Sequence, residues 1–180
     1  MSQLALNNKL VKFLLLTGSF YITWLISYEF IIKPWGFLDQ VITENITYFI
    51  CVGLENLNLH PHYNLAKNIS ETYIYLGNNP IPIIRVGASC NGLELLVLFS
   101  IFILCYPSKS KGKPAFIIIG LLLIHLVNML RNFILTLMTI TDSKYFDVFH
   151  RYIFIFMVYG VIFALWLWWA NKQRKHEIKT

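Results

Sequence analysis

Long apolar segments constrain this chain more than any other feature of its sequence. An α-helix needs about 20 apolar residues to cross a hydrocarbon core about 30 Å thick, and several segments reach that length. Hydrophobic residues make up 57% of the 180 residues and charged residues only 13%, whereas a soluble domain has about 25% charged residues. We therefore predict an all-α membrane protein, with one integral membrane domain over residues 1–180. Its four transmembrane helices are expected at residues 10–32, 88–106, 115–140 and 148–170.

Basic residues predict how these helices are oriented. Residues 10–32 are too long for a signal peptide and lack a small-x-small cleavage site, so we expect this helix to be retained. With four crossings, three basic clusters fall on one side of the membrane, which the positive-inside rule makes the cytoplasmic side. Both termini would then be cytoplasmic, and residues 33–87 would form an external loop. The clusters are Lys9 and Lys12; Lys109, Lys111 and Lys113; and Lys172, Arg174, Lys175 and Lys179.

The net charge and the cysteines exclude several classes of function. The formal net charge of +6 comes mainly from these short flanks, so it indicates topology and not nucleic-acid binding. The three cysteines form no CxxC motif and no His/Cys pair with zinc-ligand spacing, and His60 and His62 alone are a weak metal signal. We expect no metal, no cofactor and no nucleic-acid partner; the lipid bilayer is the partner that the composition itself predicts.

The external loop carries two predicted elements. Apolar residues recur loosely at helical spacing over residues 37–59, which favours an amphipathic helix on the outer surface or a helix packed on the bundle. Two β-rich runs, residues 72–76 and 81–86, flank a Gly/Asn/Pro turn and predict a β-hairpin, with an irregular loop as the alternative. Pro82 would confine the second strand to a sheet edge, where an extended peptide can add as a strand.

Cys90 is the first candidate for chemistry. It lies in the run Gly87-Ala-Ser-Cys90-Asn-Gly92, which is expected to open the second transmembrane helix. The unpaired N–H groups and the dipole of a helix N-terminus favour a thiolate, the reactive form of cysteine. Two alternatives stay open. Cys90 can act as a small buried hydrophobe, or it can form a disulfide with Cys51 of the external loop.

Arg131 and His150 are expected near the same membrane surface. Arg131 lies roughly 24 Å along the third helix at 1.5 Å per residue, close to the outer surface, and a charge within a transmembrane helix indicates function. Its alternatives are snorkelling or a structural ion pair. His150, at the external start of the fourth helix, can exchange a proton near neutral pH, or it is simply a solvated polar group.

Neighbouring polar residues can support this site. Asn128 precedes Arg131 by three residues and shares its helix surface. Glu94 follows Cys90 by four residues, and it can pair with Arg131, orient His150 or pair with Arg85. His125 lies deeper in the third helix, and we interpret it as a hydrogen-bonded packing residue.

Three of these motifs stand on successive predicted helices within residues 80–165. In chain order they are Cys90-Asn-Gly92, Asn128-Met-Leu-Arg131 and His150. In these motifs the chain resembles the exosortase/archaeosortase family of membrane transpeptidases, and most of all the short exosortases of Bacteroidetes-type bacteria. The family usually has serine at the position of Asn91, and many members have more helices than this chain.

The resemblance implies a cysteine transpeptidase or protease, a hydrolase acting on peptide bonds. Cys90 would attack a peptide carbonyl and form a thioester, His150 would transfer protons, and Arg131 would stabilise the oxyanion, with Asn128 and Glu94 as supporting residues. The substrates would be exported proteins that end in a recognition motif, a transmembrane helix and a basic tail. The enzyme would lie in the bacterial inner membrane with its site on the periplasmic face. The alternatives are a non-enzymatic assembly or export accessory protein, and a thiol-redox membrane protein that uses Cys51 and Cys90.

Overall fold

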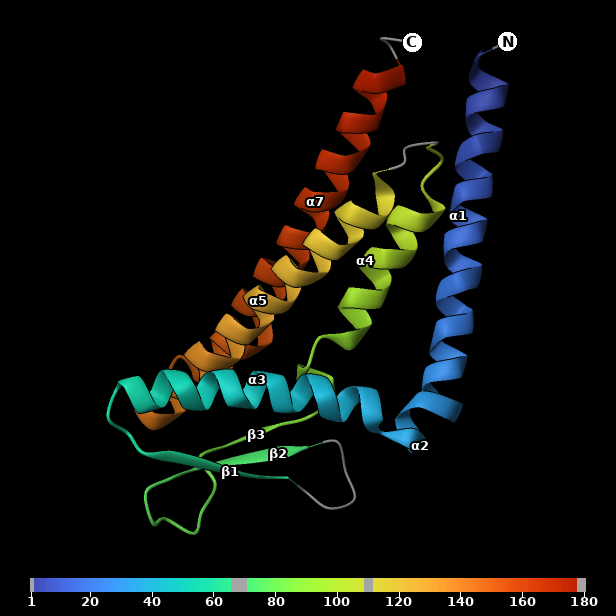
Figure 1. Ribbon diagram of the computed structural model, residues 1–180. Helices are drawn as coiled ribbons and strands as arrows, with labels where there is room; N and C mark the ends of the chain where they lie inside the picture. Colours follow the sequence, from blue (N-terminus) through green and yellow to red (C-terminus); the bar gives the residue numbers. More distant parts are fainter. Residues whose placement is uncertain (1, 66–70, 109–111, 178–180) are drawn as a thin grey trace.

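Apolar helices form a bundle in the computed structural model, which describes residues 2–65, 71–108 and 112–177 (Figure 1). Helix α1 (Ser2–Ser27) continues through a π-helical turn (Tyr28–Ile32) into α2 (Lys33–Trp35). Short α6 (Phe146–Val148) continues through a second π-helical turn (Phe149–Ile153) into α7. The remaining helices of the bundle are α4 (Leu93–Cys105), α5 (Lys113–Ile140) and α7 (Phe154–Glu177).

The count of four full transmembrane helices is not confirmed. Within the described residues, three helical segments are long and apolar enough to cross a membrane: Asn8–Trp35, Lys113–Ile140 and Phe146–Arg174. The second predicted span, residues 88–106, contains the 13-residue helix α4, about 20 Å long at 1.5 Å per residue. It is shorter because Ala88–Cys90 form a 3₁₀ turn and Gly92 takes the left-handed conformation at φ 80°. The α-helix therefore begins only at Leu93.

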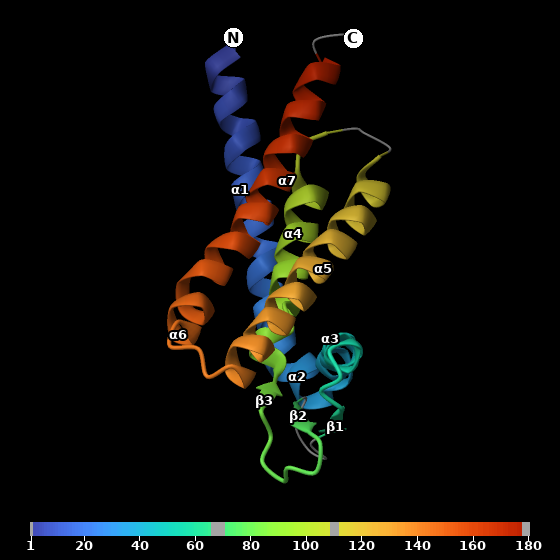
Figure 2. The ribbon, with the colours of Figure 1, turned by 90° about the vertical axis from the view of Figure 1, so that its left-hand side faces the viewer.

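Helix α4 is the centre of the bundle, in contact with α1, α5 and α7 (Figure 2). A core cluster joins α4, α5 and α7 around residues such as Phe99, Phe116 and Trp169. Gly120 of α5 lies directly against the Phe99 ring and leaves no room for a Cβ atom. This small residue lets the two helices approach closely, as is common between membrane helices.

Both chain termini, the end of α4 and the start of α5 lie at one end of the bundle (Figure 1). This arrangement gathers the described members of the predicted basic clusters at that end: Lys9 and Lys12 on α1, Lys113 on α5, and Lys172 and Arg174 on α7. Lys109, Lys111 and Lys179 lie outside the described residues, and the side chain of Lys175 is not described.

Helix α3 (Phe37–Asn56) and a small sheet form a layer across the opposite end of the bundle (Figure 1). Helix α3 runs crosswise to the bundle helices, over nearly the range predicted for a helix, and the sheet lies beyond it. One face of α3, centred on Ile46, Ile50 and Leu54, is fully buried and packs against α5 and the sheet. Helix α3 is therefore packed on the bundle.

The sheet holds three antiparallel strands in the order β1-β2-β3. The predicted hairpin corresponds to β2 (Thr72–Leu76) and β3 (Ile84–Val86), with Ile74 opposite Ile84. Strand β3 begins two residues after Pro82 and lies at a sheet edge. Strand β1 (Pro61–Leu65) was not predicted, because its polar residues form no alternating pattern; pairing with β2 creates it. Strand β3 leads directly into the turn that carries Cys90.

Candidate functional site

The Cys90 thiol lies on a turn between β3 and α4. The 3₁₀ turn Ala88–Cys90 is closed by a hydrogen bond from the Cys90 N–H to the Gly87 carbonyl at 2.9 Å. Cys90 was expected to open the second helix, and this is wrong: Asn91 and Gly92 separate it from the first residue of α4. The helix-dipole argument for a Cys90 thiolate loses its basis, because that effect is confined to the first turn of a helix. Cys90 is half-buried, and its sulfur lies 3.8 Å from the Ser89 hydroxyl.

Two asparagines of α5 hold the backbone of this turn. Asn128 Nδ2 and Asn132 Nδ2 donate to the Cys90 carbonyl oxygen at 3.1 and 3.2 Å. Both side chains are buried, and Asn132 Nδ2 also donates to the Asn128 carbonyl at 2.9 Å. Asn132 was not singled out from the sequence, although a second polar residue one turn after Asn128 on an apolar helix was a usable signal. The structure thus adds Asn132 to the set of site residues.

Arg131 is connected to Cys90 through Asn128. Its Nη1 donates to Asn128 Oδ1 at 3.4 Å, while its Nε is buried and has no hydrogen-bond partner among the described residues. No carboxylate of the described chain forms an ion pair with Arg131, so the structural ion pair considered for it is absent there. The guanidinium group therefore keeps a free, desolvated donor.

His150 lies in the π-helical turn Phe149–Ile153 that leads into α7. Its ring stacks on Phe146, with the ring centroids 5.6 Å apart and the planes 8° apart. The charge of Arg131 lies within electrostatic range of the imidazole. No hydrogen bond joins His150 to Cys90 within the part of the chain that the structure describes. The structure thus brings Cys90, Asn128 and Arg131 into one contact chain and leaves His150 beside it.

Glu94 faces the same cavity as Arg131 without bonding to it. The carboxylate is exposed on the first turn of α4. Of the partners considered for Glu94, Arg85 pairs instead with Glu71, at 3.6 Å. Neither Arg131 nor His150 forms an ion pair or hydrogen bond with Glu94 among the described residues. Glu94 therefore lines the cavity, and among the described residues it forms none of the interactions with Arg131, His150 or Arg85 that the sequence suggested.

A cavity of about 720 Å³ adjoins the Cys90 turn. Its volume lies within the range of about 300–1,000 Å³ that is typical of ligand sites. The end of α1, the Cys90 turn, α4, α5 and α7 all contribute to its walls. Ser89 and Gly92, which flank Cys90, and Arg131 are among its lining residues. The others are Leu25, Tyr28, Glu29, Lys33, Ala88, Leu93, Glu94, Leu95, Phe154, Ile155, Val158 and Tyr159.

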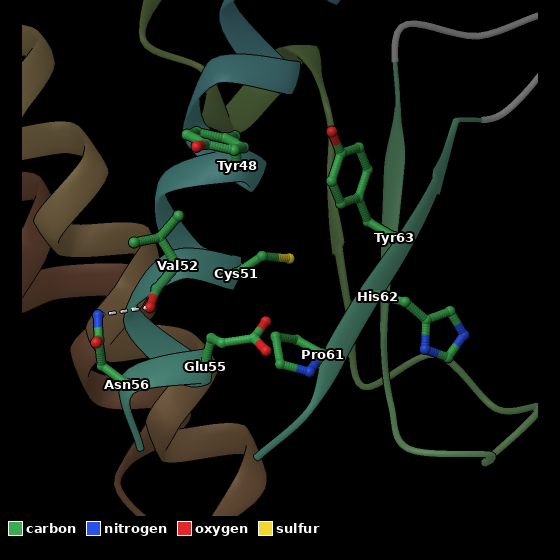
Figure 3. A pocket seen from close by; sticks show the side chains of 8 residues that line it. All are labelled: Tyr48, Cys51, Val52, Glu55, Asn56, Pro61, His62 and Tyr63. Atoms are coloured by element: carbon green, nitrogen blue, oxygen red, sulfur yellow. Dashed lines mark hydrogen bonds between the residues drawn. The ribbon is translucent and has the colours of Figure 1, made fainter. Parts of the chain in front are cut away.

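Cys51 belongs to a different cavity, between α3 and β1. This cavity has a volume of about 480 Å³, and the Cys51 sulfur points across it toward β1 (Figure 3). Burial, with a smaller contribution from Glu55, raises the pKa of the Cys51 thiol to about 11. All three cysteines are free thiols, so the Cys51–Cys90 disulfide considered from the sequence is not formed in this structure.

His125 joins two layers of the protein. Its Nε2 lies 2.9 Å from Asn45 Oδ1, so the imidazole of α5 is tied to helix α3. This contact agrees with its interpretation as a hydrogen-bonded packing residue, and it separates His125 from the Cys90 turn.

Comparison with known proteins places the site in context. A family model described as transmembrane exosortase matches residues 62–168. The match includes the Cys90 turn, α4, α5 and most of α7, and it begins after α1 and α3. No curated protein and no solved structure matches the chain.

Proposed function

Because the chain belongs to the transmembrane exosortase family, we propose that it is a membrane-embedded cysteine transpeptidase for the C-terminal sorting signals of exported proteins. The observation that carries this proposal is the contact chain from the Cys90 turn through Asn128 to Arg131, beside a cavity between helices. A thiol on a turn whose neighbouring residues line the cavity, and a cationic donor of the cavity wall with no partner among the described residues, are the parts that acyl transfer through a thioester requires.

Cys90 is the proposed nucleophile. Its sulfur attacks the carbonyl carbon of the scissile peptide bond, and the thiol proton passes to His150. The C–N bond then breaks, His150 returns the proton to the leaving amine, and a thioester to Cys90 remains. An amine, hydroxyl or water attacks the thioester carbon and releases the thiol. The backbone supports this role, since hydrogen bonds from α5 fix the position of the Cys90 carbonyl.

Arg131 is proposed to stabilise the oxyanion. Its buried Nε lacks a partner among the described residues, and its Nη1 is anchored by Asn128. A preoriented donor in a dry site stabilises a developing negative charge far more than one in water does. Asn128 would position both the Cys90 turn and the guanidinium group.

His150 is proposed as the general base and acid. Hydrogen bonds of catalytic groups are often long in free enzymes and tighten when substrate binds, so we expect the imidazole to approach Cys90 in the substrate complex. The π-helical turn that carries His150 is a feature frequent at functional sites.

The proposed substrate is an exported protein with a C-terminal motif, a transmembrane helix and a basic tail. Much of the cavity wall is apolar, with Leu25 on one side and Phe154 and Val158 on the other, as suits an apolar segment. We expect the basic ends of α1, α5 and α7 on the cytoplasmic side of a bacterial inner membrane. The Cys90 turn would then lie on the external side, where the recognition motif of an exported protein emerges.

The alternatives make different demands on the cysteines. A redox protein needs Cys51 and Cys90 to react together, but Cys51 lines a separate cavity, where burial raises the pKa of its thiol to about 11. An accessory protein needs no free thiol at all. Neither alternative accounts for the buried Arg131 Nε, which has no partner in the described part of the chain.

The proposal is tested with a reporter, a soluble domain fused to the C-terminal tail of an exported protein from the same genome. Co-expression with the wild-type protein should shorten the reporter by its transmembrane helix and basic tail, as measured by mass spectrometry. Cys90→Ala should insert normally and leave the reporter intact. Cys105→Ala is the matched control, because this thiol lies at the opposite end of α4. Normal processing by Cys90→Ala would disprove the transpeptidase role.

A further inference from the structure

Asp39 is a buried carboxylate that the proposed chemistry does not use. It lies in the first turn of α3, only 1% exposed. The described ion pairs are Lys33–Glu29 and Arg85–Glu71, so no described cation neutralises Asp39. Its two oxygens accept hydrogen bonds from Tyr28 Oη at 3.0 Å and from Asn91 Nδ2 at 2.6 Å. A buried carboxylate without a cation is unfavourable unless its hydrogen bonds are strong, so its contacts point to a role.

The contact between Asp39 and Asn91 spans 52 residues of sequence and reaches the residue directly after Cys90. Asn91 is also 1% exposed. Its Oδ1 accepts the Leu93 N–H at 2.9 Å, which is one of the N–H groups that the start of an α-helix leaves unpaired. The Asn91 amide thus links the Cys90 turn to α3 through its Nδ2 donor and to α4 through its Oδ1 acceptor.

We propose that Asp39 is a positioning residue that sets the orientation of Cys90 through Asn91, an inference that rests on the proposed function of Cys90. The α5 asparagines hold the turn by the Cys90 carbonyl. Asp39 of α3 holds the same turn through the side chain of the following residue, Asn91. With both anchors in place, the turn has one conformation and the sulfur one direction.

The second oxygen of Asp39 extends this contact to the cavity. Its partner Tyr28 lines the cavity beside the Cys90 turn and lies in the π-helical turn at the end of α1. Asp39 therefore links a wall of the cavity to the nucleophile turn through two hydrogen bonds to one carboxylate. Charge-assisted hydrogen bonds of this kind are about twice as strong as neutral ones.

The pair can be exchanged, which gives a sharp test. Asn91→Asp alone sets two carboxylates against each other across the 2.6 Å contact. The double variant Asp39→Asn with Asn91→Asp restores an amide facing a carboxylate. The amide at position 39 can still accept from Tyr28, and the carboxylate at position 91 can still accept from the Leu93 N–H.

The first readout is the alkylation rate of Cys90 by a membrane-impermeant maleimide, in a background where Cys51 and Cys105 are serine. Asn91→Asp should change this rate by about tenfold, the equivalent of one buried hydrogen bond, and the exchange should return it to within about twofold of the parent. Cys51, as the single thiol in a matched background, should be unaffected by the same substitutions. An equal change at Cys51 would mean general loosening of the fold and would overturn the inference.

The second readout is reporter processing. Asn91→Asp should lower kcat by about 10²-fold, as misplacement of a reacting group by about 1 Å does, with KM little changed, and the exchange should recover most of this loss. A double variant no better than Asn91→Asp in either assay would overturn the positioning role. The alkylation assay needs no substrate, so it tests the positioning role alone. Failure of the proposed function would be seen separately, because the wild-type protein would then leave the reporter intact.

Discussion

Substitution of Gly92 by alanine should disable the site while a matched glycine elsewhere tolerates the same change. Gly92 has φ 80°, a left-handed conformation that costs an L-residue about 1–2 kcal/mol. A Cβ atom there would lie 3.0 Å from Asn128 Nδ2, the atom that donates to the Cys90 carbonyl at 3.1 Å. Displacing this amide removes one buried hydrogen bond of about 1 kcal/mol. Gly92→Ala should therefore destabilise the protein by about 2–3 kcal/mol.

Gly77 is the control, because it shares the backbone strain without the contact. Its φ is 53°, and a Cβ atom added there meets nothing within 4 Å. Gly77→Ala should then destabilise the protein by only about 1–2 kcal/mol, and it should leave the Cys90 turn undisturbed. The difference between the two variants isolates the effect of displacing Asn128.

The assay combines thermal unfolding in detergent with processing of the reporter protein. Gly92→Ala should lower kcat at least about tenfold, since the displaced amide positions both Cys90 and Arg131, whereas Gly77→Ala should keep the wild-type kcat. Equal kcat values for the two variants would refute the reasoning, because Gly92 would then matter only through its backbone conformation.

Two further predictions concern Arg131 and Cys51. Arg131→Lys should lower kcat by about 10²–10³-fold in the reporter assay, because lysine keeps the charge but lacks the Nε donor; a wild-type rate would exclude Arg131 from oxyanion stabilisation. Alkylation of Cys51, as the single thiol, should be slow at pH 8 and should rise with pH until about 11, because burial raises its pKa to about 11 and only the thiolate reacts. The rate is measured by mass spectrometry, and a plateau reached near pH 9, as for an exposed thiol, would contradict this burial effect.

Local patterns determined much of the fold in advance. Apolar runs predicted the long helices α1, α5 and α7, because hydropathy over about 20 residues is a property of consecutive residues. The basic flanks predicted which helix ends share one side of the bundle, and those that the structure describes lie at one end. The helix over residues 37–59 and the hairpin also followed from local periodicity. The order of the cysteine, asparagine, arginine and histidine motifs was likewise sufficient for the family assignment.

The geometry of the site was decided only by tertiary structure. A glycine in the sequence does not show that its backbone is left-handed, as that of Gly92 is. The start of α4 at Leu93 and the position of Cys90 on a turn therefore became clear only with the fold. The partner of Glu94 could not be chosen from spacing, because Arg85 of β3 pairs instead with Glu71, the residue before the neighbouring strand β2.

The remaining contacts of the site join residues that are far apart in the sequence. Asp39 and Asn91 are 52 residues apart, and Asn132 meets the Cys90 carbonyl across 42 residues. Helical and strand periodicity relate only residues a few positions apart, so no local pattern pairs these groups. The sequence alone determined that a cysteine, an arginine and a histidine follow one another along an apolar, largely helical chain. Packing of α3 and α5 against one turn decided how the cysteine is held, because hydrogen bonds to a turn come from whichever elements the fold places beside it.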